Sequence, residues 1–164
     1  ILTRTGEAPD RVDRAVGHVY GMPNAAALAA AMARARDGIC ATPSYALSAT
    51  LGFHAAGTPF HVWNTKSVYG RAYDLWDDAA AWEGRTMVYV GLRGRITPEA
   101  IRAMRPHFRR MILYGFGSDW PRNIVAAVND PEVLGVRHAA VTPGLTAFFV
   151  IEGFSFSSKG TGHE

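Results

Sequence analysis

The chain lacks the features that would place it in several common functional classes. Its single cysteine, Cys40, excludes an internal disulfide and a zinc site built from several cysteines. No stretch approaches the roughly 20 apolar residues that span a bilayer, and no charged-then-apolar signal segment opens the chain. The basic residues are scattered singly or in pairs, so the net charge of +3 does not indicate nucleic-acid binding.

Phosphate-binding loops and metal-ligand clusters are also missing from the sequence. No GxGxxG or GxxxxGK[ST] pattern follows a predicted strand, and the glycines at 91–94 and 115–117 are typical of turns. His54 and His61 flank a turn without a further ligand at metal-binding spacing. The helix start at Thr42–Tyr45 could still hold an anion through backbone N–H groups. We expect no metal and no other cofactor.

The composition is that of a single globular domain. Apolar residues make up 48% and charged residues 19% of the 164 residues, which is enough to build one compact core. The sequence starts at Ile1 without an initiator methionine. We therefore expect a piece of a longer protein, whose remaining part could carry membrane segments or catalytic residues.

Alternating helix and strand patterns predict an α/β domain over residues 1–156. The expected helices are 25–36 (with Asn24 as its N-cap), 43–55, 97–104 and 121–128, and the expected strands are 39–41, 60–63, 86–90, 110–116 and 145–156. This order predicts a three-layer structure, with a mostly parallel sheet of about five strands and helices on both faces. The remaining segments are an irregular lead-in (1–22), an elaboration (117–147) and a mobile polar tail (157–164).

A ligand site is expected beyond the carboxyl ends of the strands, as is usual in such sheets. Thr42, Ser44 and Tyr45 follow the first strand. Asn64 and the irregular segment Ser67–Trp76 follow the second. The two strand ends therefore predict one shared rim that could bind a small molecule.

Two interpretations of the segment after the second strand remain open. Arg71 and Asp74 are close enough in sequence to pair and fix the segment, with Tyr73 and Trp76 pointing inward as anchors. Alternatively, the aromatic rings and the arginine present flat faces and hydrogen-bond donors to a sugar or a phosphate.

No residue set is sufficient for catalysis by itself. Cys40 lies in a predicted strand, where it should be an inert apolar residue, and Ser44 lacks a GxSxG elbow. Three carboxylates lie close together in the sequence, at Asp74, Asp77 and Asp78, and a glycosidase uses a pair of such groups. A helix cap is the simpler interpretation of Asp77 and Asp78. We therefore predict no catalytic residue in this chain.

Five short motifs follow one another in an order and spacing found in one family. They are YGMP (20–23), TPSYALSA (42–49), LGFH (51–54), FHVWN (60–64) and RAYDLW (71–76). The set resembles the soluble C-terminal extracytoplasmic domain of bacterial membrane glycosyltransferases, the dolichyl-phosphate-mannose mannosyltransferase and aminoarabinose transferase-like group. The resemblance covers about residues 19 to 116. Ala72 stands where the family usually has glutamine, and Met22 where it has tryptophan.

The resemblance implies an accessory role. In that family the membrane-embedded part transfers a sugar from a polyprenyl-phosphate donor. This chain would then dock substrates or partners at the periplasmic or extracytoplasmic face of the bacterial inner membrane. Its partners would be the transmembrane part of the same protein and a polyprenyl-phosphate sugar or glycan acceptor. The expected ligand contacts are Thr42, Ser44, Tyr45, Asn64, Arg71, Tyr73, Asp74 and Trp76.

Two other functions remain open at this point. One is a free-standing carbohydrate or small-molecule binding module that uses the same rim. The other is a small hydrolase or transferase that uses Asp74 or Asp77.

Overall fold

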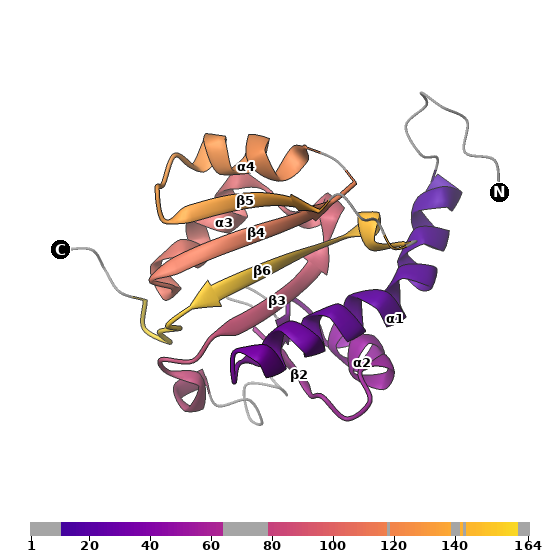
Figure 1. Ribbon diagram of the computed structural model, residues 1–164, viewed down its shortest axis with the longest axis horizontal. Helices are drawn as coiled ribbons and strands as arrows, with labels where there is room; N and C mark the ends of the chain where they lie inside the picture. Colours follow the sequence, from indigo (N-terminus) through magenta and orange to yellow (C-terminus); the bar gives the residue numbers. More distant parts are fainter. Residues whose placement is uncertain (1–10, 64–78, 118, 139–141, 143, 161–164) are drawn as a thin grey trace.

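A computed structural model describes residues 11–63, 79–117, 119–138, 142 and 144–160 (Figure 1). The helices are α1 (Arg11–Ala35), α2 (Tyr45–His54), α3 (Pro98–Met104) and α4 (Trp120–Val128). The strands are β1 (Ile39–Thr42), β2 (Phe60–Val62), β3 (Met87–Leu92), β4 (Arg110–Phe116), β5 (Val133–His138) and β6 (Phe148–Phe154). Short 3-10 turns are η1 (Ala79–Trp82), η2 (Arg93–Arg95), η3 (Arg105–His107) and η4 (Leu145–Ala147).

The strands form one six-stranded sheet in the order β2-β1-β3-β6-β4-β5. Strand β1 pairs in parallel with β2 and with β3, and β4 pairs in parallel with β5. The last strand, β6, runs antiparallel between β3 and β4 and joins the two parallel parts. The predicted α/β class with a mostly parallel sheet is confirmed, with one strand more than expected.

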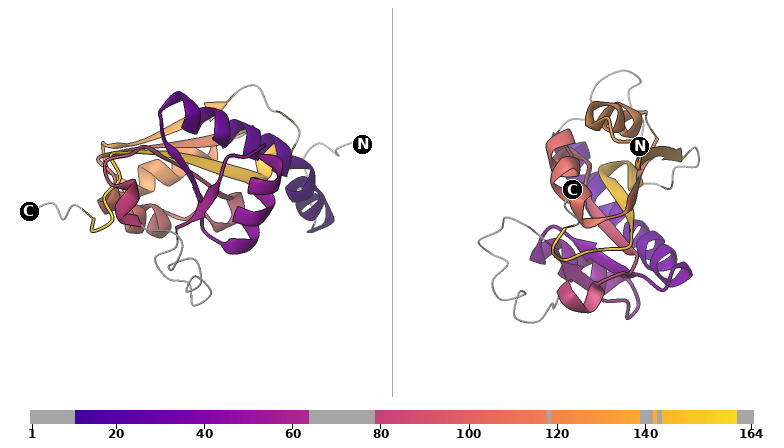
Figure 2. Two further views of the ribbon diagram at one scale, coloured as in Figure 1. Left: turned by 90° about the horizontal axis from the view of Figure 1, so that it is seen from below. Right: turned by 90° about the vertical axis from the view of Figure 1, so that its left-hand side faces the viewer.

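Helices cover both faces of the sheet, as the apolar strands require. Along β6, Phe148 and Val150 face a core shared with α1 and α2, whereas Phe149 and Ile151 face a core shared with α3 and η1. The views in Figure 2 show α1 and α3 on opposite faces of the sheet. The structure therefore has the three layers that the sequence predicts.

Helix α1 begins much earlier than predicted. We expected a start after Asn24 and an irregular lead-in over 1–22, but the helix runs from Arg11 through Pro23. A proline inside a helix removes one backbone donor, and its ring crowds the carbonyl four residues earlier, so packing against the rest of the fold has to stabilise the turn before Pro23. Gly21 lies so close to Gly144 that a Cβ at position 21 would clash with its carbonyl oxygen. This close approach holds the helix against the start of η4.

The second half of α1 packs closely on the sheet through small side chains. Its buried positions are alanines, with exposed fractions of 2% or less: Ala25, Ala26, Ala29, Ala30 and Ala33. Leu28 and Met32, which are only partly buried, pack at the edge of this contact. The prediction of an alanine-rich packing helix is confirmed for this half.

The start of α2 differs by two residues from the prediction. Thr42 pairs with Val62 and ends β1 as a fully buried residue, so it does not cap the helix. Ser44 is the N-cap, and its Oγ accepts a hydrogen bond from the backbone N–H of Leu47 at 3.4 Å. For α3 the predicted cap is confirmed, because Thr97 accepts a bond from Ala100 N–H.

The elaboration predicted over 117–147 contains an element that the sequence analysis missed. Strand β5 adds to the edge of the sheet beside β4. Gly135 interrupts its apolar pattern, and this glycine lies against Pro121 of α4.

The predicted tail also departs from expectation, because Ser157 N–H donates to His107 O and Ser158 N–H donates to Glu83 Oε2. Residues 157–158 are therefore attached to the domain.

Candidate functional site

Three residues of the predicted rim lie together at the junction of β1 and α2. The hydroxyl of Thr42 donates to Ser44 O at 3.0 Å, and the hydroxyl of Ser44 caps α2. These two hydroxyls therefore stabilise the local backbone, while Tyr45 is exposed. The other expected ligand contacts, Asn64, Arg71, Tyr73, Asp74 and Trp76, lie outside the described residues. A rim site that combines the two groups stays a prediction.

A groove with a volume of about 440 Å³ lies beside α1, at a place that the sequence analysis did not indicate. Helix α1 crosses β3 and β6, and in the described chain no helix lies over β4 and β5 on this face (Figure 1). The groove forms along the side of α1, where the part of the sheet that this helix covers gives way to the uncovered part. It is lined by Leu28, Met32, Ala35, Arg36, Tyr114, Phe116, His138 and Glu152.

Glu152 is the central polar residue of this groove. It is buried in β6, and its Oε1 accepts a hydrogen bond from Arg36 Nε at 3.1 Å. Its Oε2 accepts a hydrogen bond from the hydroxyl of Tyr114 at 2.8 Å. A buried carboxylate without partners would cost several kcal/mol, so these two bonds make its position possible.

The phenol of Tyr114 is held in its neutral form. Burial raises its pKa to about 12, and the hydrogen bond to Glu152 and the negative charge of that residue act in the same direction. The hydroxyl therefore remains a proton donor at neutral pH, and its O–H is directed at Glu152. This fixes the phenol ring at the wall of the groove.

Aromatic rings from β4 and β5 continue this wall. Phe116 and His138 are opposite each other in the parallel register, and their rings stack with centroids 5.5 Å apart at an angle of 27°. The His138 ring also lies 5.4 Å from the ring of Tyr114. Phe116 is buried whereas His138 is exposed. The groove therefore offers one accessible imidazole supported from below by a buried phenyl ring.

One signal in the sequence could have indicated this site. Glu152 is the only charged residue in the apolar run Phe148–Phe154 of a predicted strand. A carboxylate in such a run requires a buried partner. The partners themselves, Arg36 and Tyr114, come from distant segments, and no spacing pattern connects them.

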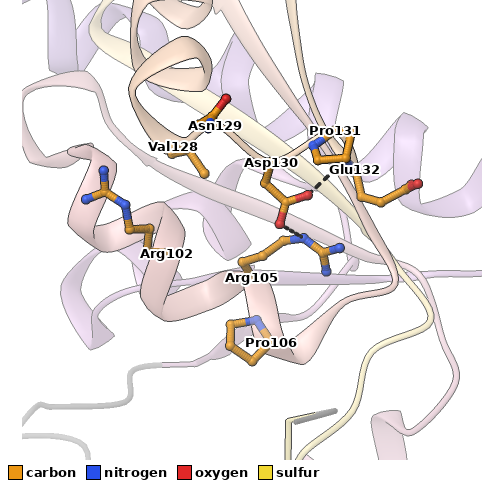
Figure 3. A pocket seen from close by; sticks show the side chains of 8 residues that line it. All are labelled: Arg102, Arg105, Pro106, Val128, Asn129, Asp130, Pro131 and Glu132. Carbon is orange, nitrogen blue, oxygen red and sulfur yellow. Dashed lines mark hydrogen bonds and ion pairs between the residues drawn. The ribbon is translucent and has the colours of Figure 1, made fainter. Parts of the chain in front are cut away.

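A second hollow, which we term the seam, lies between the ends of α3 and α4 and has a volume of about 470 Å³ (Figure 3). Arg105 is buried there, and its Nε donates to Asp130 Oδ2 at 2.8 Å while Nη1 donates to Phe108 O. Asp130 Oδ1 accepts from Glu132 N–H at 2.9 Å. These bonds attach the turn after α4 to the segment after α3.

The location of the seam favours a structural role. It adjoins Arg105–His107 and Glu132, which come just before β4 and β5 begin. Ligands of α/β sheets bind at the opposite, carboxyl ends of the strands. Arg102, also at the seam, donates to Ala127 O at 2.6 Å. We therefore interpret the seam as a set of bonds that serves the fold.

The remaining reactive side chains offer little chemistry. Cys40 is buried in β1, as predicted, and this burial raises the pKa of its thiol to about 12, so little of the nucleophilic thiolate forms at neutral pH. Within the described ranges, no group of three or more His, Cys, Asp or Glu residues is arranged to hold a metal ion. None of the helices in the described part of the chain is long and apolar enough to cross a membrane.

Comparisons with protein-family models, with curated proteins and with solved structures found no match. The fold and the groove define the chain as an α/β domain with a hollow of a size suited to a small molecule.

Proposed function

We propose that the chain is an accessory extracytoplasmic domain of a polyprenyl-phosphate-sugar-dependent membrane glycosyltransferase. Its role is to dock a substrate or a partner, and the chemistry belongs to the transmembrane part of the same protein. The observation that carries this proposal is the arrangement of the motifs. Residues 42–49, 51–54 and 60–63, which belong to three of the five motifs of the resemblance, form one contiguous parallel β1-α2-β2 unit.

Exposed side chains near the ends of β1 and β3 support a docking role. Gly21 of α1 lies against Phe148, which pairs with the last residue of β3. Val19 and Tyr20 are therefore at the same end of the sheet as Tyr45, and all three are exposed. Large exposed apolar side chains that gather at one end of a domain often mark an interaction surface.

The described reactive groups are consistent with a docking domain. The thiol of Cys40 is buried and neutral, and the hydroxyls of Thr42 and Ser44 are bonded to the backbone of the β1–α2 junction. A nucleophile needs an adjacent base or a lowered pKa. In the described structure these three residues show neither an adjacent base nor a lowered pKa, which favours docking over chemistry.

The first test uses the complete reading frame that contains this chain. We expect a run of transmembrane helices encoded upstream, and their absence would refute the proposal. Membranes that contain the full-length protein should then transfer a labelled sugar from a polyprenyl-phosphate donor to its acceptor.

Variants at the docking end of the domain give the second test. Tyr20→Ala combined with Tyr45→Ala should slow this transfer by about tenfold, which corresponds to a loss of about 1.4 kcal/mol of interface energy. The matched control is Phe53→Ala, because Phe53 is also an exposed aromatic residue but lies at the opposite end of α2. Equal rates in the double variant and the control would count against docking at this end.

A free-standing carbohydrate or small-molecule binding module is the second candidate, and the groove beside α1 favours it. The same reading frame separates the two candidates, because a free-standing module needs no transmembrane part.

A further inference from the structure

We infer that the groove beside α1 is a binding site for a single sugar ring, with hydroxyl groups on Glu152 and Arg36 and one ring face on His138. This site shares no lining residue with Val19, Tyr20 and Tyr45 at the docking end of the domain. The inference holds whether the chain belongs to a glycosyltransferase or acts as a free-standing module.

The size of the groove suits a small ligand. Its volume of about 440 Å³ lies in the range of roughly 300–1,000 Å³ that small-molecule sites occupy. Its walls come from α1 on one side and from β4, β5 and β6 on the other. A ligand would therefore rest on regular elements that are fixed by the core, which favours a preformed site.

The polar part of the groove pairs acceptors with donors. Each oxygen of Glu152 accepts one bond from the protein, and a carboxylate has about four acceptor positions in total. The bond to Glu152 uses one of the roughly five N–H donors of Arg36, and the side chain of Arg36 is 57% exposed. Neighbouring hydroxyls of a sugar both donate and accept, so an adjacent carboxylate and guanidinium match them.

The apolar part of the groove matches the C–H face of a sugar. His138 is exposed and stacks on Phe116, which keeps the imidazole ring in a fixed plane. Leu28 and Met32 form the opposite wall on α1. A sugar ring placed between these walls buries its apolar face and keeps its hydroxyls toward Glu152.

Other occupants fit the groove less well. The carboxylate of Glu152 repels an anion, and the guanidinium bonded to it repels a metal ion. A purely apolar ligand would take Arg36 and Glu152 out of water without new hydrogen bonds. Arg110 adds positive charge near Tyr114, but it lies over the ring of Phe154 and does not line the groove. Inorganic phosphate is therefore the competing ligand to include in the test.

The test is a titration of the 164-residue chain with the methyl glycosides of glucose, mannose and galactose, followed by saturation-transfer NMR and calorimetry. We expect at least one glycoside to bind with a Kd near the millimolar range. His138→Ala should weaken this binding at least about fivefold, since it removes a ring contact of about 1 kcal/mol. Tyr114→Phe should also weaken it, because Glu152 Oε2 loses the hydrogen bond that positions the carboxylate for the ligand. The matched control His54→Ala, which changes an exposed histidine of α2, should bind like the unaltered chain.

The variants are chosen to keep the fold, because one removes only a hydroxyl and the other changes an exposed ring. Circular dichroism before each titration checks this. Binding of inorganic phosphate without binding of any glycoside would overturn the inference. Binding of a glycoside that neither Tyr114→Phe nor His138→Ala weakens would also overturn it, as would no binding of any glycoside.

Discussion

The groove and the seam each hold an arginine–carboxylate pair in hollows of similar volume, but the two pairs are buried in opposite ways. In the seam, the Arg105 side chain is 9% exposed and that of Asp130 is 27% exposed. In the groove, the Glu152 side chain is 4% exposed and that of Arg36 is 57% exposed. The two ion-pair distances, 2.8 and 3.1 Å, differ little.

The difference shows that the buried partner decides what a pair can do. A buried arginine such as Arg105 has its donors directed at Asp130 and Phe108 O, so it holds two segments together. A buried carboxylate such as Glu152 leaves its partner Arg36, which also lines the groove, 57% exposed. Volume and charge alone would not have separated a structural pair from a candidate binding site.

The largest expected effect comes from breaking the seam. Arg105→Met should lower the free energy of unfolding by about 3–5 kcal/mol, because it removes one partner of a largely buried ion pair. Urea unfolding of the purified chain measures this loss. Arg137→Met is the matched control, since its ion pair with Asp119 is exposed, lies away from the seam and should contribute little to stability. Equal losses in the two variants would contradict a structural role for Arg105.

Removing the buried acid of the groove should have a smaller effect. Glu152→Ala leaves the hydroxyl of Tyr114 without its acceptor, but Arg36 can still be hydrated, so we expect a loss of about 1.5–3 kcal/mol. Glu132→Ala, at an exposed acid beside the seam, should change stability by less than about 0.5 kcal/mol. The same urea experiment compares Glu152→Ala with Glu132→Ala. A loss of stability in Glu152→Ala larger than that in Arg105→Met would contradict the expected order of the groove and the seam.

At alkaline pH, the loss of stability should differ between a group in the buried core, Cys40, and a group in the open groove, Tyr114. Burial raises the pKa of Cys40 from 9.0 to about 12, so the folded chain keeps this proton longer than the unfolded chain does. Stability from this group is complete below pH 9 and is lost as the pH rises toward 12. The contribution of Cys40 to the free energy of unfolding should fall by about 1.4 kcal/mol per pH unit in this window.

Two variants check this slope by urea unfolding between pH 8 and 11 (about the range where both groups titrate). Cys40→Ala should flatten the decline, although it also lowers stability at every pH by leaving a small cavity. Tyr114→Phe should flatten it less, because solvent screens the partly exposed phenol. A steeper decline in Cys40→Ala than in the unaltered chain would contradict the assigned direction.

Local patterns predicted most of the fold. The apolar runs of β3 and β4 and the Thr97–Pro98 start of α3 were sufficient to place these elements. The antiparallel position of β6 was not predictable from alternation, because it depends on where the last strand inserts between two parallel parts. Strand β5 was missed since Gly135 breaks its pattern, and its close contacts with Pro121 and Val125 of α4 explain that glycine.

The candidate groove was less accessible to sequence reasoning than the fold. Arg36, Tyr114, His138 and Glu152 are separated by tens of residues and belong to four different elements or their ends. Each has an ordinary interpretation by itself, and only the register of β4, β5 and β6 brings them together. The position of Thr42, Ser44 and Tyr45 at the β1–α2 junction was predictable because strand ends follow directly from the strand assignment, whereas their role as ligand contacts stays a prediction.

The most direct test of the contrast between groove and seam is an amide ¹H–¹⁵N shift map of the chain, saturated with whichever of the three methyl glycosides binds most tightly. We expect the largest shifts at Arg36, Tyr114, His138 and Glu152, and unchanged signals at Arg105 and Asp130. Shifts of equal size at the groove and the seam, or the largest shifts at the seam, would contradict the claim that the groove, unlike the seam, has groups available to a ligand.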